Sequence, residues 1–245
     1  MNAYPFVYAL HVGIGALALG AFWTAGLSRK GSRVHVLAGK IYLVAMIVVL
    51  ASAFPLAIRL LLRGAGDFAW FLLYLLVITS TAVWTGWRAI RDKRDYARFI
   101  GSVYRVLAVV NVASGAAVLA LGTYTGRPTL IAFSFIGLLG GGAMLRNVRR
   151  GQPDSPRWWM REHLGAMIGT GIATHIAFLG IGLPKLLPML AGPVLQNIAW
   201  FGPLAVAIAA RILLGRKYLR MPAALTPATA DAQVAMPQPA QGSAT

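Results

Sequence analysis

The chain has 245 residues, of which 58% are hydrophobic and 12% are charged. A soluble domain carries about 25% charged residues, so this composition excludes an ordinary soluble domain and favours a membrane protein. The absence of cysteine excludes disulfides, iron–sulfur clusters and thiolate zinc sites. The net charge of +17 does not indicate nucleic acid as a partner, because the basic residues lie between apolar segments, as in multi-pass membrane proteins.

Apolar segments long enough to cross a bilayer recur along the chain. Each is near the ~20 residues that an α-helix needs to cross ~30 Å of hydrocarbon. They predict an all-α polytopic membrane helix bundle with seven transmembrane helices, at roughly 5–27, 37–62, 68–87, 102–124, 128–146, 162–183 and 197–215. Residues 1–220 are expected to form this transmembrane domain, and the Ala-, Pro- and Gln-rich segment 221–245 is expected to be a disordered cytoplasmic tail. The N-terminus MNAYPF has no basic region, so no cleavable signal peptide is predicted.

Lys and Arg are distributed unevenly between the two sides of the predicted bundle. Of the 23 in the chain, only four fall at the second, fourth and sixth loops, namely Arg59, Arg63, Arg127 and Lys185. The positive-inside rule therefore places the N-terminus outside and the C-terminus in the cytoplasm. The lipid bilayer is the predicted surrounding, and the basic third loop, 88–105, is a candidate contact for anionic lipid headgroups.

Acidic residues are scarce, and none of the six falls in the middle of a predicted span. Proton- and cation-coupled carriers usually have a carboxylate within the membrane, and intramembrane aspartyl proteases need two. The seventh span has no Lys in its interior, which excludes the retinal Schiff base of a rhodopsin. No catalytic group is predicted, and the sequence leaves open whether the chain is an enzyme.

Imidazole is the remaining functional chemistry, and the four histidines fall at two depths. His11 and His175 lie toward the outer side, whereas His35 and His163 lie at the cytoplasmic starts of the second and sixth spans. The two levels are 12 residues apart on the sixth span, or ~18 Å. Two histidines at each of two depths could hold two b-type haems through axial imidazoles. This pattern predicts transmembrane electron transfer, with a quinol as a candidate electron donor.

Neighbouring residues are compatible with haem at these positions. Glycines four residues from three of the histidines would let a macrocycle approach the backbone, and cations at the inner level could pair with propionates. The glycines are Gly15, Gly39 and Gly171, and the cations are Arg33, Lys40 and Arg161.

A second interpretation needs no cofactor. Histidines at a membrane interface often anchor a helix, and buried histidines often hydrogen-bond to a neighbouring helix. A metal-ion or ligand site is a third possibility, and the stripe of Met167, Thr170 and Thr174 could line a cavity. Because His163 and His175 point ~120° apart around one helix, they are expected to make separate contacts, with spans one and two. Two classes of function follow: a non-enzymatic assembly factor, sensor or small-ligand permease with structural histidines, or a haem redox protein.

Two segments resemble signatures of a bacterial family of predicted multi-pass membrane proteins. The first, after a span that carries His11, is Arg33-x-His35-x3-Gly39-Lys40-x-Tyr42. The second is Trp159-Met160-Arg161-x-His163-x3-Met167, followed by Ala177-Phe178. The likeness covers most of 5–220. That family is known only as a domain of unknown function, so the resemblance implies a multi-pass protein of the bacterial inner membrane and no activity.

Overall fold

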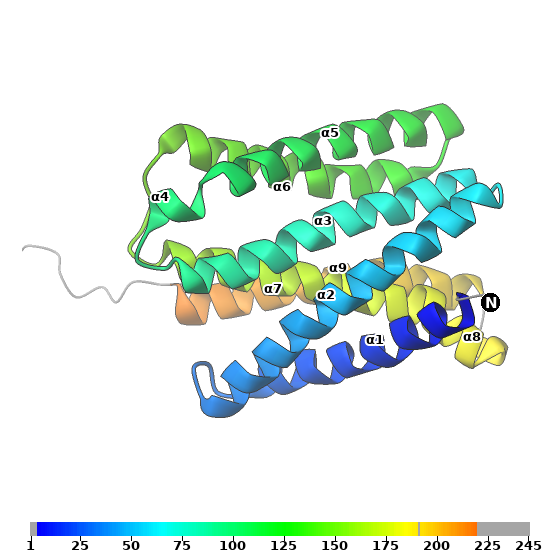
Figure 1. The fold of residues 1–245 in the computed structure, drawn as a ribbon, viewed down its shortest axis with the longest axis horizontal. Coiled ribbons are helices and arrows are strands. Elements are labelled where there is room, and N and C mark those ends of the chain that lie inside the picture. The colour runs from blue at the N-terminus through cyan, green and yellow to red at the C-terminus, as the bar shows by residue number, and fades with distance from the viewer. Residues whose placement is uncertain (1–3, 191, 220–245) are drawn as a thin grey trace, which may run out of the picture.

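The computed structural model describes residues 4–190 and 192–219, and all regular elements in these residues are helices (Figure 1). Seven of the described helices are long and apolar enough to cross a membrane, which confirms the all-α, seven-span prediction. They are α1 (Tyr4–Leu27), α2 (Arg33–Leu62), α3 (Gly66–Arg91), α5 (Ser102–Thr125), α6 (Pro128–Arg150), α7 (Trp158–Ala177, with its continuation to Leu186) and α9 (Pro193–Tyr218). The predicted tail, 221–245, lies outside the described residues.

Most helices extend beyond the predicted spans, chiefly at the ends with many Lys and Arg. Helix α2 begins at Arg33 rather than 37, where the Ser32 side chain accepts a hydrogen bond from the His35 backbone N–H (3.2 Å). Helix α7 begins at Trp158 rather than 162, and α3 continues to Arg91. Hydropathy marks only the part of a helix in hydrocarbon, whereas charged and capping residues continue it into the interface.

The turn after α3 is organised by a buried carboxylate. Arg88 and Asp92, four residues apart, form an ion pair at the end of α3, and Asp92 also pairs with Arg98 (3.6 Å). Asp95 caps the short helix α4 (Tyr96–Phe99) by accepting from the Arg98 N–H. The side chain of Asp92 is only 1% exposed, so its two guanidinium partners compensate a buried charge.

The sixth span contains a π-helical turn that the hydrophobic pattern did not reveal. Helix α7 ends at Ala177 and is followed by a π-helical turn, η1 (Phe178–Gly182), and by α8 (Leu183–Leu186). A short 3₁₀ turn, η2 (Pro188–Leu190), follows. By contrast, α2 and α9 remain helical through Pro55 and Pro203.

Helices α3 and α7 run side by side through the middle of the bundle (Figure 1). The hairpin of α5 and α6 packs on α3, and α9 packs on α7. The hairpin of α1 and α2 lies on the other side, where α2 contacts α3 and α1 contacts α7. Aromatic side chains fill the interior toward both ends of the bundle, with Phe71 and Trp200 at one end and Phe99 and Trp158 at the other.

Glycines on α6 allow α5 and α6 to pack closely. A Cβ atom at Gly137 would lie 2.8 Å from the Asn111 carbonyl oxygen, and one at Gly141 would lie 2.8 Å from the Ala108 carbonyl oxygen. Asn111 also donates from Nδ2 to Thr81 Oγ1 (2.7 Å) and so connects α5 to α3. The GxxxG spacing therefore serves packing within one chain.

The α1–α2 turn, α4 and the C-terminal end of α9 lie at the same end of the bundle, opposite the start of α1 (Figure 1). Since the loops rich in Lys and Arg gather there, we call it the basic end. Under the positive-inside rule it is the cytoplasmic end.

Candidate functional site

His35 lies in the first turn of α2, at the basic end. Its Nδ1 is 2.9 Å from the carbonyl oxygen of Ala25 on α1. A carbonyl only accepts, so Nδ1 carries the proton and Nε2 is an acceptor or a ligand atom. Among the residues that the structure describes, no hydrogen-bond partner meets Nε2 of His35.

His163 has the same arrangement in the second turn of α7. Its Nδ1 is 2.9 Å from the carbonyl oxygen of Gly86 on α3, and Nε2 again has no hydrogen-bond partner within 4–190 and 192–219. The partner is on α3, not on the second span as expected from the sequence. Gly86 has no side chain, and the methyl group of Met167 occupies the position that a Cβ atom would take.

We call these two imidazoles, each of which bonds through Nδ1 to a carbonyl of a neighbouring helix, the inner histidine pair. Lys30 donates from Nζ to the Ala25 carbonyl oxygen (3.2 Å), which also accepts from His35. Burial, and then repulsion by Lys217, lowers the pKa of Lys30. The inner histidine pair is therefore in a locally cationic environment.

His175, in contrast, uses both ring nitrogens within the protein. Nδ1 donates to the Gly171 carbonyl oxygen (2.7 Å), and Nε2 accepts from the indole Nε1 of Trp23 on α1 (2.9 Å). The Phe22 ring packs edge-on to this imidazole and occupies the space beside Gly171 that the sequence suggested for a macrocycle. His175 thus contacts the first span, as expected, but as a helix–helix contact.

His11 connects α1 to α2. Its Nδ1 lies 3.0 Å from Ser52 Oγ and 3.2 Å from the Val49 carbonyl oxygen. The partners of His11 are on α2, whereas Trp23 and Phe22, which surround His175, are on α1. The two outer histidines therefore belong to different contacts.

The polar stripe on α7 is packed. Thr170 is fully buried and donates to the Met167 carbonyl oxygen (3.0 Å). Thr174 donates to the Thr170 carbonyl oxygen (2.9 Å), and its hydroxyl is 3.3 Å from that of Tyr42 on α2. These residues fill an interface, so they do not line the cavity that a permease would need.

Arg161, a sequence candidate for binding a propionate, is engaged elsewhere. It pairs with Asp154 and lies 3.6 Å from Glu162 Oε1. The hydrogen bond from Arg161 lowers the pKa of Asp154. Arg33 and Lys40, the other two candidates, form no ion pair or hydrogen bond with any described residue.

The sequence identified the two inner histidines but missed what holds them. The carbonyl groups of Ala25 and Gly86 carry no sequence signal, since every residue has one. Trp23 and Lys30 were also missed, because an interfacial Trp and a loop Lys are common in any membrane protein. Comparison with protein-family models, with curated proteins and with solved structures found no match.

Proposed function

We propose that this chain is a redox protein of the bacterial inner membrane, with one b-type haem held by His35 and His163 near the cytoplasmic face. The observation that supports this most is that the two imidazole rings make the same hydrogen bond. Each donates its Nδ1 proton to a carbonyl of a neighbouring helix, at 2.9 Å in both cases, and leaves Nε2 for a ligand. A backbone carbonyl on the far nitrogen is the usual way in which a protein orients an imidazole that binds a metal.

The number of donors favours haem over a bare metal ion. Zinc in proteins usually takes three or four protein ligands. In the described part of the chain, no group of three or more His, Cys, Asp or Glu residues could hold a metal ion. A haem supplies four equatorial nitrogens itself and needs only two axial ligands, which matches a pair of histidines.

The local charge also suits this cofactor. A b-type haem carries two propionates, and the cations around the inner histidine pair have no carboxylate on their own hairpin, since the first acidic residue of the chain is Asp67. Lys30, which shares the Ala25 carbonyl with His35, is the residue that we assign to a propionate. Arg161 is not assigned, because Asp154 and Glu162 already neutralise it.

The chain's own contribution is to orient the rings and to set the charge around them. A bound haem would supply one-electron chemistry, with a quinol as the candidate donor. Both ring nitrogens of His175 are engaged by Trp23 and Gly171, so no second axial ligand remains at the outer level and the proposal contains one haem, not two. The family resemblance of segments 33–42 and 159–167 is part of this proposal, since both contain the assigned ligands.

The test is the absorption spectrum of the protein purified in detergent after expression with added haem precursor. A Soret band and a shift of the visible bands on dithionite reduction are expected. His35→Ala and His163→Ala should each remove these bands, and His175→Ala should keep them as the matched control. Absence of a Soret band from the unmodified protein would refute the proposal, and so would loss of the bands in His175→Ala with retention in His163→Ala.

The second candidate is a non-enzymatic membrane protein in which all four histidines join helices. The full engagement of His175 favours it. In that case His35→Ala and His163→Ala should lower the thermal unfolding midpoint as much as His175→Ala does, and no variant should change a spectrum.

A further inference from the structure

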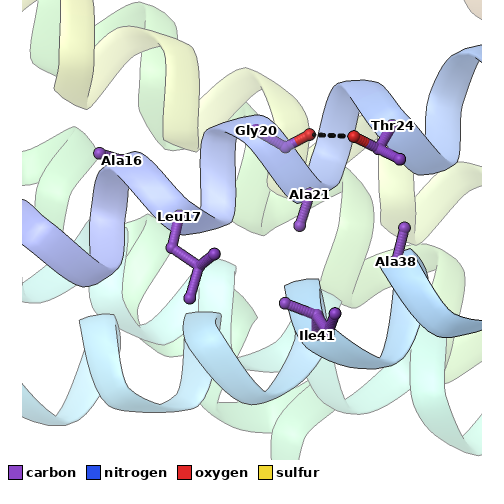
Figure 2. A pocket seen from close by; sticks show the side chains of 7 residues that line it. All are labelled: Ala16, Leu17, Gly20, Ala21, Thr24, Ala38 and Ile41. Atoms are coloured by element: carbon purple, nitrogen blue, oxygen red, sulfur yellow. Dashed lines mark hydrogen bonds between the residues drawn. The ribbon is translucent and has the colours of Figure 1, made fainter.

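An apolar groove runs along the outer side of the α1–α2 hairpin (Figure 2). Its first part has a volume of about 430 Å³ and is lined by Ala16, Leu17, Gly20, Ala21, Thr24, Ala38 and Ile41. Its second part, about 320 Å³, shares Leu17 and Ile41 with the first. The second part also contains Lys40, Val44 and Val48.

The groove exists because its floor consists of small residues, which leave space between the larger side chains of its walls. Ala21, Ala38 and Ala45 are buried, and a Cβ atom at Gly20 would meet no atom within 4 Å. Thr24 turns its hydroxyl onto its own helix, where it donates to the Gly20 carbonyl oxygen (2.8 Å; Figure 2). The surface that remains is apolar, as a site for a hydrocarbon chain must be.

The aliphatic walls face away from the bundle. Leu17 is 51% exposed, Ile41 40% and Val44 63%. In a membrane these side chains lie against lipid, since there is no hydrophobic driving force to bury them against protein.

Two cations lie on the exposed side of α2 toward the basic end. Lys40 lines the groove, and Arg33 lies seven residues earlier, hence on nearly the same face and ~10 Å nearer the basic end. Both are exposed, and neither pairs with any residue of the described chain. No acid precedes Asp67, so the hairpin cannot neutralise them itself. A Lys at this depth reaches its ammonium group back to the headgroup layer.

We propose that the α1–α2 groove binds one acyl chain of an anionic phospholipid, whose phosphate pairs with Lys40 and Arg33. The apolar floor and walls accept the chain, and the two unpaired cations select the headgroup charge. A second copy of this protein is a poorer occupant. In such a dimer, Lys40 would lie in an interface with the α1–α2 hairpin of the other copy. That hairpin also contains cations and no acid, so it could not neutralise Lys40. The proposal does not depend on whether the inner histidine pair binds haem.

The experiment is native mass spectrometry of the full chain released from detergent with equimolar phosphatidylglycerol and phosphatidylcholine of the same acyl chains. One phosphatidylglycerol should remain bound in preference to phosphatidylcholine. Each cation near an anionic surface contributes a factor of about five in affinity. Lys40→Gln and Arg33→Gln should therefore each weaken phosphatidylglycerol binding about fivefold, and Arg63→Gln, at the exposed opposite end of α2, should not.

A pair of glycine variants separates the groove from the rest of α1. Gly20→Leu fills the groove and should abolish the tightly bound lipid. Gly13→Leu is the matched control, because a Cβ atom there also meets nothing within 4 Å and Gly13 does not line the groove. Both proteins should fold, which is checked by circular dichroism.

Three results would overturn the proposal. Equal retention of the two lipids would show that the groove does not recognise charge. Equal loss of lipid in Gly20→Leu and Gly13→Leu would show that binding is not in the groove. A protein that is dimeric, and that Gly20→Leu converts to a monomer while lipid binding is unchanged, would identify the groove as a contact between copies.

Discussion

Two helical hairpins of this molecule use glycine in opposite ways. In the α5–α6 hairpin, the backbone of one helix touches the glycines of the other, as at Gly137 and Gly141. In the α1–α2 hairpin, a Cβ atom at Gly20 or Gly39 would meet nothing within 4 Å. Both hairpins are apolar and rich in glycine, so composition does not distinguish the closely packed one from the open one.

The two hairpins also differ in the functional groups that they carry. The α5–α6 hairpin contains no histidine and is joined to α3 by buried hydrogen bonds such as that from Asn111. The α1–α2 hairpin carries His11 and His35, unpaired cations and an apolar groove. The hairpin with less internal packing is therefore the one with room for ligands.

The largest effect is expected where glycine allows backbone contact. In Gly141→Ala, the new Cβ atom would lie 2.8 Å from the Ala108 carbonyl oxygen and from Val112 Cγ2, so the helices must separate. Such overpacking lowers the free energy of unfolding by about 1–3 kcal/mol. The same change at Gly20 should instead raise it, by up to about 1 kcal/mol, because alanine favours the helix. Unfolding in mixed detergent with increasing SDS, followed by circular dichroism, measures both. If the two substitutions changed the free energy of unfolding in the same direction, the two hairpins would not differ in packing as described.

A smaller effect is expected where α1 contacts α7. Trp23→Phe removes the donor to His175 Nε2 but keeps an aromatic ring. Interhelical hydrogen bonds within membranes contribute about 0.6 kcal/mol on average, so the free energy of unfolding should fall by about that amount. Trp70→Phe, at an exposed Trp of α3, is the control and should change little. If the protein binds haem, Trp23→Phe should leave its spectrum intact. A lost Soret band would show that the outer histidine belongs to the same site.

The smallest effect concerns the basic end, where the loop between α6 and α7 has an acid, Asp154, and the α1–α2 turn has none. Asp154 pairs with Arg150 of α6 (3.3 Å) and with Arg161 of α7. Its pKa in the folded protein is lowered from 3.8, chiefly by the hydrogen bond from Arg161. The folded state therefore binds fewer protons than the unfolded state near this pH. The stabilisation is complete above about pH 5 and is lost as the pH falls through the folded-state pKa.

Asp154→Asn should lower the free energy of unfolding at pH 6 by less than about 1 kcal/mol, as is usual for partly exposed ion pairs. The difference from the unmodified protein should shrink as the pH is lowered toward 3. Thermal unfolding midpoints of the two proteins at several pH values measure this. A constant difference across that range would mean that the ion pair does not contribute.

The sequence placed His35 and His163 at the starts of two helices, as the structure has them, but it did not give their partners or those of the outer histidines. His35 and His163 follow basic loops and begin helices, and these are local features that the chain displays directly. His11 and His175 were placed at one level from their distance along the helices. The structure brings His175 to Trp23, which is 12 residues, or ~18 Å, further along α1 than His11. Depth counted along each helix separately does not include how the helices are offset against one another.

The sequence by itself determined the number of spans, their approximate limits and the side on which the charges gather. An apolar segment of ~20 residues can satisfy its backbone in a bilayer only as a helix, so local composition is sufficient for these features. Only the tertiary structure decided which imidazole nitrogens are engaged and which glycines are in contact. It also decided that the groove lies between α1 and α2. These features depend on which helices are neighbours and how far apart they lie, and no single segment of the chain encodes that.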